Sequence, residues 1–331
     1  MSNTVPPAGP SPEDAHPPLG SLALARAGVD RGGDWRVTPG LMERLWSAPG
    51  TKVMLIAHGR SPVRDSSLLL VDAASIDPTR TPVYLGHTTV AGAGPAGSEP
   101  AGTDVVLLML KEPSNQWEGD ESVRWIGLRE AATELPARDA ALFVEAAAIA
   151  NWHATHTHCP RCGTPTDVES GGWVRRCPVD NSEHFPRTDP AIIATVIDEN
   201  DRLLLGSSAQ WSNKRFSTLA GFVEPGESLE AAVIREIAEE SGVRVHSPRY
   251  LGSQPWPFPA SLMLGFTARA HSAEAVPDGV EISDLRWFTR QELTEAVGSG
   301  EVVIASGASI ARSLIEHWYG GPIAEPAGPQ P

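Results

Sequence analysis

Three closely spaced glutamates are the residues best suited to chemistry in this sequence. Glu236, Glu239 and Glu240 occur at positions i, i+3 and i+4, so a helix places them together on one face. Clustered carboxylates repel one another unless a positive charge lies among them, and Mg²⁺ or Mn²⁺ prefers such oxygen ligands. Arg235, four residues before Glu239, can hold that carboxylate in place. The spacing therefore predicts a helix that binds a divalent cation.

The helix that must position these carboxylates has an apolar face of its own. Leu229, Val233 and Ile237 recur every four residues, as expected of an amphipathic helix. Gly221 and Gly226 permit the loop before the helix, and Gly242 can end it. We therefore expect one face of the helix to pack on a core while another face presents the glutamates.

The whole segment 221–243 reads GFVEPGESLEAAVIREIAEESGV. It matches the pattern G-x5-E-x7-R-E-U-x-E-E-x-G-U, with U aliphatic, and is identified as a Nudix box. The resemblance implies a metal-dependent enzyme that cleaves a nucleoside diphosphate linked to another group. A solvated acidic helix is the alternative interpretation, and nine matched positions at fixed spacing argue against it.

A second motif follows about ten residues after the box, where residues 253–261 read SQPWPFPAS. Its three prolines exclude a helix or a central strand, so we expect a rigid extended loop that presents Trp256 and Phe258. Their aromatic faces suit a flat ring such as adenine or nicotinamide. A loop that only fills a core is the alternative.

Together, the two motifs resemble those of the NADH pyrophosphatases of the NudC type, and the resemblance covers about residues 20–320. It implies hydrolysis of NADH or NAD⁺ to the nicotinamide mononucleotide and AMP, and removal of NAD caps from RNA 5′ ends. It also implies a homodimer. The alternatives are a Nudix hydrolase for another substrate such as ADP-ribose, and a non-catalytic zinc-ribbon binding protein.

The resemblance assigns roles to individual residues. The metal-binding positions for Mg²⁺ or Mn²⁺ are the Ala220 carbonyl and Glu236, Glu239, Glu240 and Glu281, and the catalytic set adds Glu227 and Arg235. Glu239 is either a metal ligand or the base that activates water. The substrate-binding positions are Phe185, Phe222, Gln254, Pro255, Trp256, Pro257, Phe258, Pro259, Ala260, Ser261 and Ala311. Phe185 stands where the family often has tyrosine, so it keeps the ring and lacks the hydroxyl.

A cysteine-rich segment before the Nudix box predicts a structural zinc site. Its expected ligands are Cys159, Cys162, Cys177 and Asp180. The fourth position departs from the usual pair of C-x-x-C knuckles, because Asp180 stands where a cysteine is expected. Zinc accepts carboxylate oxygen, while His184 and His158 are alternative fourth ligands. A ribbon that has lost its metal is the remaining alternative.

The expected fold class is α/β (α+β): a Nudix α/β/α sandwich with a mixed sheet, preceded by a small zinc ribbon and a divergent α/β N-terminal domain. The expected boundaries are a disordered N-terminus at 1–20, the NADH pyrophosphatase-like N-terminal domain at 21–155, the zinc ribbon at 156–187, the Nudix hydrolase domain at 188–320 and a disordered tail at 321–331. Hydrophobic patterns predict strands at 53–57, 67–71 and 104–110, helices at 138–153 and 308–318, and a strand–turn–strand at 191–206.

The composition of the chain limits the kinds of partner and the cellular compartment that we expect. The 331 residues carry a net charge of −15, so we expect no broad basic surface for nucleic acid, and an RNA substrate would be gripped at its capped end. No apolar run approaches the length of a membrane span and no signal peptide is recognisable. Three cysteines, two of them in a C-x-x-C, fit a reducing compartment. We therefore expect a cytoplasmic protein.

Overall fold

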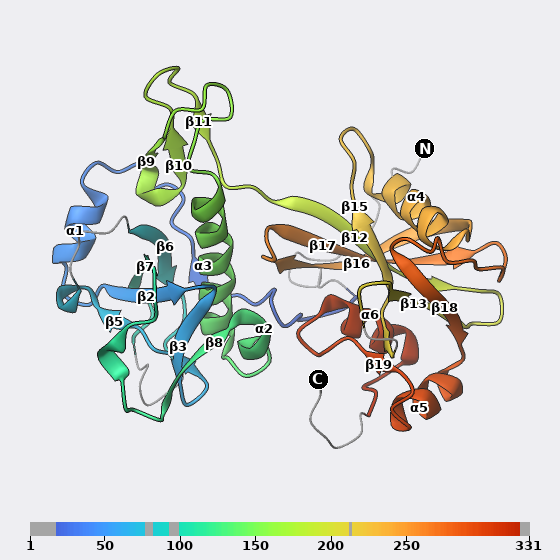
Figure 1. Ribbon diagram of the computed structural model, residues 1–331. Helices are drawn as coiled ribbons and strands as arrows, with labels where there is room; N and C mark the ends of the chain where they lie inside the picture. Colours follow the sequence, from blue (N-terminus) through green and yellow to red (C-terminus); the bar gives the residue numbers. More distant parts are fainter. Residues whose placement is uncertain (1–17, 77–81, 93–98, 212–213, 325–331) are drawn as a thin grey trace, which may run out of the picture. The chain divides into compact units, whose positions relative to one another are not determined.

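A computed structural model describes residues 18–76, 82–92, 99–211 and 214–324 (Figure 1). The chain divides into two compact units. Unit 1 consists of Met1–Leu22, Ile192–Ser253 and Leu264–Pro331, and unit 2 consists of Ala23–Ala191 and Gln254–Met263. Most of the residues for which we predicted disorder, at 1–20 and 321–331, lie outside the described ranges.

Unit 1 is built on a six-stranded sheet in the order β16-β17-β12-β13-β18, with β15 paired to β12. The elements are β12 (Asp189–Ile197, which begins in unit 2), β13 (Leu203–Ser208), β14 (Arg215–Phe216), β15 (Leu219–Phe222), α4 (Leu229–Ser241), β16 (Val245–Trp256), β17 (Ser261–Ala270), β18 (Ile282–Phe288), α5 (Arg290–Gly298), β19 (Val303–Ile304) and α6 (Ile310–Tyr319). The predicted strand–turn–strand and the last helix are confirmed.

Both faces of this sheet are buried, because successive side chains of a strand point to opposite faces. In β13, Leu204 packs in one core with Val233 and Ile237 of α4, while Leu203 and Leu205 pack in a second core with residues of α5 and α6. Figure 1 shows α4 on one side of the sheet and α5 and α6 on the other. The predicted α/β/α sandwich is therefore confirmed.

The proline motif forms the tip of the hairpin that joins β16 to β17, which corrects one expectation. We predicted a loop throughout 253–261, whereas β16 extends to Trp256 and β17 begins at Ser261. Pro255 is tolerated within β16 because this strand lies at the edge of the sheet, where a missing N–H breaks no inner ladder. The tip belongs to unit 2.

Unit 2 contains an eight-stranded mixed sheet and a three-stranded antiparallel ribbon in the order β11-β10-β9. Its elements are β1 (Val29–Asp30), α1 (Leu41–Ser47), β2 (Lys52–Ala57), β3 (Arg60–Arg64), β4 (Ser67–Leu68), β5 (Val71–Asp72), η2 (Ala73–Ser75), β6 (Val83–Thr88), β7 (Asp104–Leu110), η3 (Asn115–Trp117), β8 (Val123–Gly127), α2 (Leu128–Ala131), α3 (Ala137–Thr155), β9 (Asp167–Glu169), η4 (Ser170–Gly172), β10 (Val174–Arg176) and β11 (Glu183–His184). The predictions for β2, β7 and α3 are confirmed.

The single strand predicted at 67–71 is wrong, because the chain changes partners inside it. Leu68 of β4 pairs with β3, whereas Val71 of β5 pairs with β2. The Leu68 N–H is taken by a buried carboxylate of α3, Asp139, at 2.9 Å. Arg138 joins Asp139 at 2.7 Å and Glu99 at 3.0 Å. This buried ion group fixes the start of α3 in the unit, since buried charges persist only when paired.

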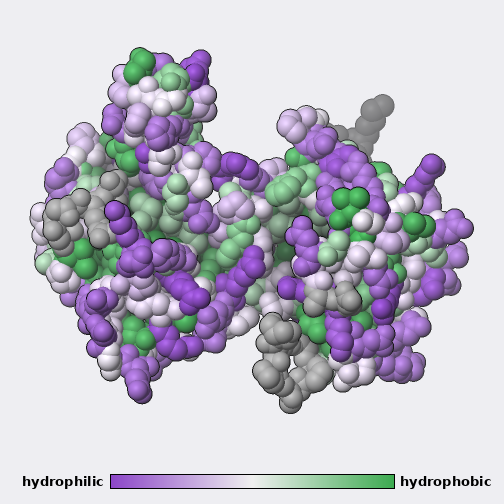
Figure 2. Space-filling model, viewed as in Figure 1, coloured by the Kyte–Doolittle hydropathy of each residue, from purple (hydrophilic) through white to green (hydrophobic). Residues whose placement is uncertain are grey.

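Hydrophilic side chains are spread over both units on the face drawn in Figure 2, in keeping with the net charge of −15. Within the described residues, no helix combines the length and the apolar character that a membrane span requires.

The packing of α4 gives a direct stability test. Ile237 is fully buried against the sheet, whereas Ile234 on the same helix is 43% exposed. We expect Ile237→Ala to lower the free energy of unfolding by about 2–5 kcal/mol through lost burial and a residual cavity, and Ile234→Ala to change it by no more than about 0.5 kcal/mol. Urea titration followed by circular dichroism measures both. Equal effects would contradict the proposed packing.

Candidate active site and metal cluster

The helix α4 that holds the clustered glutamates begins and ends at defined caps. Ser228 accepts a hydrogen bond on its hydroxyl from the Ala231 N–H at 3.2 Å, which satisfies one of the free N–H groups of the first turn. Gly242 ends the helix in the left-handed conformation, with φ of 69°. The predicted end of the helix at Gly242 is confirmed.

Arg235 lies at the centre of the carboxylates. Its guanidinium donates to both oxygens of Glu227, at 2.9 and 2.8 Å, and to Glu239 at 2.9 Å. It is also 2.9 Å from Glu236. The same side chain donates to the Phe222 carbonyl at 2.9 Å. One planar cation thus binds three carboxylates and the strand before the helix, which suits the forked geometry of arginine.

These contacts set the protonation of the cluster. The hydrogen bonds of Arg235 lower the pKa of Glu227, and the pKa of Arg235 is raised chiefly by its hydrogen bond to Glu227. Burial raises the pKa of Glu236, against the effect of Arg235. Glu227 is therefore a firmly ionised support, while Glu236 holds its charge less easily.

Glu240 lies deepest in the cluster. It is 6% exposed, and burial, followed by the negative charges of Glu236 and Glu281, raises its pKa to about 8. Its Oε2 atom is buried and has no hydrogen-bond partner among the described residues. A buried carboxylate oxygen without a donor is costly, and a divalent cation supplies the missing positive charge. The residues present therefore fit such an ion.

Gly221 matters because of the close approach of α4. A Cβ atom at this position would overlap the carboxylate of Glu236. The first residue of the Nudix box must therefore lack a side chain so that Glu236 can lie against β15.

Glu281 is held by a turn that the sequence reasoning did not single out. The Oδ1 atom of Asp278 accepts hydrogen bonds from the N–H groups of Val280, Glu281 and Ile282, at 3.1, 3.2 and 2.8 Å. The Glu281 carbonyl accepts one from Ala209 at 2.9 Å. Asp278 thus fixes the backbone on which Glu281 stands. The Asp-Gly pair at 278–279 is the turn signal that could have predicted it.

The tip of the proline hairpin is anchored within unit 2 by hydrogen bonds to its backbone carbonyls. The Asn151 side-chain amide of α3 donates to the carbonyls of Pro257 and Pro259, at 2.9 and 3.0 Å. The Asp189 N–H donates to the Ala260 carbonyl at 2.8 Å. Proline removes backbone donors but leaves carbonyls that need partners. Asn151 meets this need for two of them.

The aromatic residues of the tip pack on each other and on a cation. The rings of Trp256 and Phe258 meet edge to face, with centroids 4.9 Å apart. The Arg129 guanidinium lies 4.2 Å from the centre of the Phe258 ring and 5.2 Å from that of Trp256, a cation–π arrangement. No sequence motif marks Arg129 or Asn151 as a partner of the hairpin tip, because both residues lie far from the tip along the chain.

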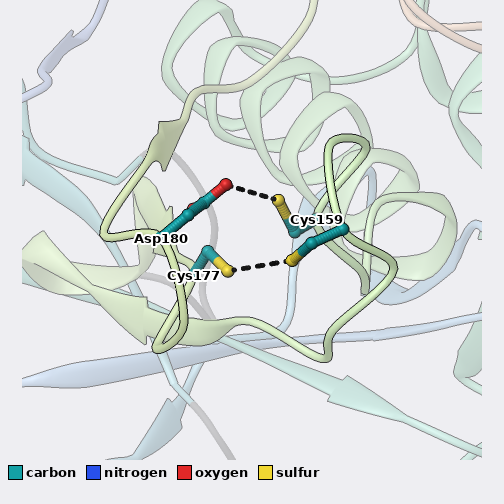
Figure 3. Close-up of side chains that lie close together, drawn as sticks. Cys159, Cys177 and Asp180 are labelled. Carbon is teal, nitrogen blue, oxygen red and sulfur yellow. Dashed lines mark hydrogen bonds between the residues drawn. The ribbon is translucent and has the colours of Figure 1, made fainter.

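The cysteine segment brings its four predicted ligands together, as Figure 3 shows for three of them. The ligand atoms of Cys159, Cys162, Cys177 and Asp180 all lie within 4.8 Å of one another, and no other such group of His, Cys, Asp and Glu occurs in the described residues. The Cys162 and Cys177 sulfurs are 3.5 Å apart, and the Cys159 sulfur is 3.7 Å from the Asp180 carboxylate. These spacings fit the edges of a tetrahedral zinc site.

Comparison with known proteins agrees with this architecture in each segment. Residues 187–305 match the NUDIX domain, residues 154–185 the NADH pyrophosphatase zinc ribbon domain, and residues 46–152 the NADH pyrophosphatase-like rudimentary NUDIX domain. The chain is 35% identical over 308 residues to the NAD-capped RNA hydrolase NudC of Mycobacterium bovis, covering 89% of this chain and 94% of that protein. The chain belongs to the NADH pyrophosphatase family of Nudix hydrolases. It is also 40% identical over 200 residues to the human NAD-capped RNA hydrolase NUDT12, covering 57% of this chain and 43% of that protein.

In this member of the NADH pyrophosphatase family, the predicted site residues fall into two groups, one in each unit. Unit 1 contains the Nudix carboxylates with Phe222 and Ala311, and unit 2 contains Phe185 and the hairpin tip. Phe222 and Phe185 are 58% and 60% exposed, whereas Ala311 is 2% exposed.

Gln254 of the substrate motif is buried, at 1% exposure, and its side-chain oxygen accepts a hydrogen bond from the Leu24 N–H at 3.3 Å. Gln254 therefore contributes to anchoring the hairpin within unit 2.

The raised pKa of Glu240 gives a pH-dependent stability. The folded state holds its proton up to about pH 8, whereas an unfolded glutamate loses it near pH 4.3. Stability therefore falls as pH rises through this window. Without added Mg²⁺ or Mn²⁺, we expect the advantage of Glu240→Gln over wild type in free energy of unfolding to grow by about 2–4 kcal/mol between pH 5 and pH 8.

Urea titrations at a series of pH values measure this difference. The control is Glu230→Gln, which changes an exposed carboxylate of the same helix. Parallel pH curves for wild type and Glu240→Gln would contradict the assigned burial of the charge.

Proposed function

We propose that this protein hydrolyses the pyrophosphate bond of NADH and NAD⁺ to nicotinamide mononucleotide and AMP, and removes NAD caps from RNA 5′ ends. The observation on which this depends most is the SQPWPFPAS hairpin tip, anchored by Asn151, in a chain with a complete Nudix helix. Support comes from the relatives, because proteins named NAD-capped RNA hydrolase match 89% of this chain.

The carboxylate cluster is the catalytic centre. The expected ligands of Mg²⁺ or Mn²⁺ are the Ala220 carbonyl and the carboxylates of Glu236, Glu240 and Glu281, with Glu239 either a further ligand or the base that activates water. When bound, the ion neutralises the pyrophosphate and stabilises the charge that develops during attack by water. Arg235 keeps the carboxylates in place despite their mutual repulsion. Glu240 must give up its proton for this role, which favours activity at mildly alkaline pH.

Glu239 is suited to activate the water. Its side chain is 60% exposed and held by Arg235 at 2.9 Å, so it can reach solvent and accept a proton without leaving the cluster. Phe222, an exposed residue two positions after Ala220, can stack on a base of the substrate, as can Phe185.

The wider assignment follows the family resemblance. We assign residues 21–155 to the N-terminal domain, 156–187 to the zinc ribbon and 188–320 to the Nudix domain, and we propose a homodimer in the cytoplasm. The three cysteines are unpaired, as expected in a reducing compartment. The net charge of −15 favours binding of RNA at its capped end rather than along its length.

The substrate is tested by side-by-side hydrolysis of NADH, NAD⁺, ADP-ribose and NAD-capped RNA, with and without Mg²⁺ or Mn²⁺. We expect the nicotinamide substrates to be preferred and nicotinamide mononucleotide to be released. Glu240→Gln should lower kcat by about a hundredfold or more while the protein stays folded, and Glu230→Gln should leave it unchanged.

If ADP-ribose is preferred, the proposed substrate is wrong and the protein is a Nudix hydrolase for ADP-ribose. Absence of any metal-dependent hydrolysis would favour a binding protein, and a wild-type rate in Glu240→Gln would overturn the assigned centre.

We also propose that the ribbon binds zinc through three thiolates and Asp180. Loss of a residue that only hydrogen-bonds to a metal ligand weakens metal affinity roughly 10–100-fold. Because Asp180 is proposed as a ligand itself, Asp180→Ala should weaken zinc retention by at least this factor. Asp180→Cys should retain zinc as the wild type does. Zinc content after dialysis against a graded chelator measures this. His184→Ala and His158→Ala are the controls, and zinc loss in either would move the fourth ligand to that histidine.

A further inference from the structure

Unit 2 contains a cavity of about 250 Å³ for which no role has yet been assigned. Helix α3 forms one wall with Glu145, Ala148 and Ile149, and the hairpin tip forms another with Pro255 and Pro257. Trp173 of the ribbon and the segment 186–188, which directly follows Phe185, complete the lining. The cavity is thus bordered by the motif expected to bind substrate.

Glu145 is a buried acid in this cavity with too few partners. It is 3% exposed, and its Oε1 atom has no hydrogen-bond partner among the described residues. The nearest cations are Arg31, with Nε 3.7 Å from Oε2, and Arg36, with Nη2 4.0 Å from Oε1. Both distances exceed that of a hydrogen bond. Burial accordingly raises the pKa of Glu145 to about 7.

Arg36 is held away from Oε1, because its guanidinium carbon lies over the Trp173 ring, 3.5 Å from the ring centre. An unpaired carboxylate oxygen in an apolar cavity costs stability. A ligand that brings an N–H donor to Oε1 would remove this cost on binding.

The rest of the lining defines that ligand. Ile149, Trp173 and the two prolines are apolar, which suits the burial of an aromatic ring. Arg31 and Arg187 are the cations of the lining, with side chains 56% and 58% exposed. The Arg187 Nε atom already donates to Asp189 at 2.6 Å, so Arg31 is the cation better suited to a phosphate outside the ring site. The volume is below the roughly 300–1,000 Å³ of drug-sized pockets, so it admits a single ring rather than a dinucleotide.

We propose that this cavity is a subsite for a flat nitrogen heterocycle with an exocyclic NH₂ group, for which Glu145 is the hydrogen-bond acceptor. The choice of ring class rests on the proposed function. NAD offers this chemistry twice, in the adenine amino group and in the nicotinamide carboxamide. Asn151 keeps the cavity formed, because it fixes the carbonyl of Pro257 in the wall.

The test is calorimetric titration of the full-length protein with AMP, nicotinamide mononucleotide and ribose 5-phosphate, without added Mg²⁺ or Mn²⁺. Glu145→Gln changes the acceptor with little change of shape. Ala148→Leu extends an exposed alanine into the cavity. The matched control is Ala154→Leu, an exposed alanine of the same helix that does not line the cavity.

We expect Glu145→Gln to weaken binding of at least one mononucleotide about tenfold, and Ala148→Leu to weaken it at least as much, with Ala154→Leu unchanged. Preference for AMP would assign the cavity to adenine, and preference for the other mononucleotide to nicotinamide. Wild-type affinity in both cavity variants, or equally tight binding of ribose 5-phosphate, would overturn the proposal.

The outcome is separable from that for the proposed function, since binding is measured without turnover. Binding that depends on Glu145 in a protein that hydrolyses no dinucleotide would retain the subsite and reject the enzyme. If the protein hydrolyses NADH and neither cavity variant changes mononucleotide binding, the enzyme would be retained and the subsite rejected.

Discussion

The charge balance around Arg235 is the constraint on which the catalytic unit depends. One guanidinium binds Glu227, Glu236 and Glu239, and it ties the helix to the Phe222 carbonyl. Without this cation the carboxylates of α4 would repel one another and the strand before them would lose an anchor. Because the negative charges still exceed the positive one, and the buried Oε2 atom of Glu240 has no donor among the described residues, the cluster retains a strong preference for a divalent cation.

The same helix must satisfy packing and charge at once, and its two faces divide these tasks. Val233 and Ile237 bury against the sheet, while Glu236 occupies space beside Gly221 that a side chain would fill. The Nudix pattern therefore specifies more than a set of ligands. It also specifies the glycine that allows a carboxylate to contact a strand, and Gly242, which ends the helix.

The proline motif raises a different problem, since a segment poor in N–H donors leaves its carbonyls unsatisfied. Here Asn151 of α3 supplies the donors, and Arg129 covers the aromatic rings. The domain that matches a rudimentary NUDIX domain therefore has a physical task in this chain. Its helix α3, fixed at one end by Arg138 and Asp139, supports the hairpin tip and lines the cavity that contains Glu145.

The sequence by itself determined the local features, because they depend on spacing within one element: the Nudix helix with its end at Gly242, the family, and the four residues of the metal cluster. It could not reveal Asn151, Arg129 or Glu145, since their roles depend on contacts with residues far away along the chain. It joined β4 and β5 into one strand because strand partners are not visible in a local pattern. The Oε1 atom of Glu145 lacks a hydrogen-bond donor among the described residues, and the pKa of Glu240 is raised, only because folding removes water from both carboxylates. The tertiary structure alone decided these two properties.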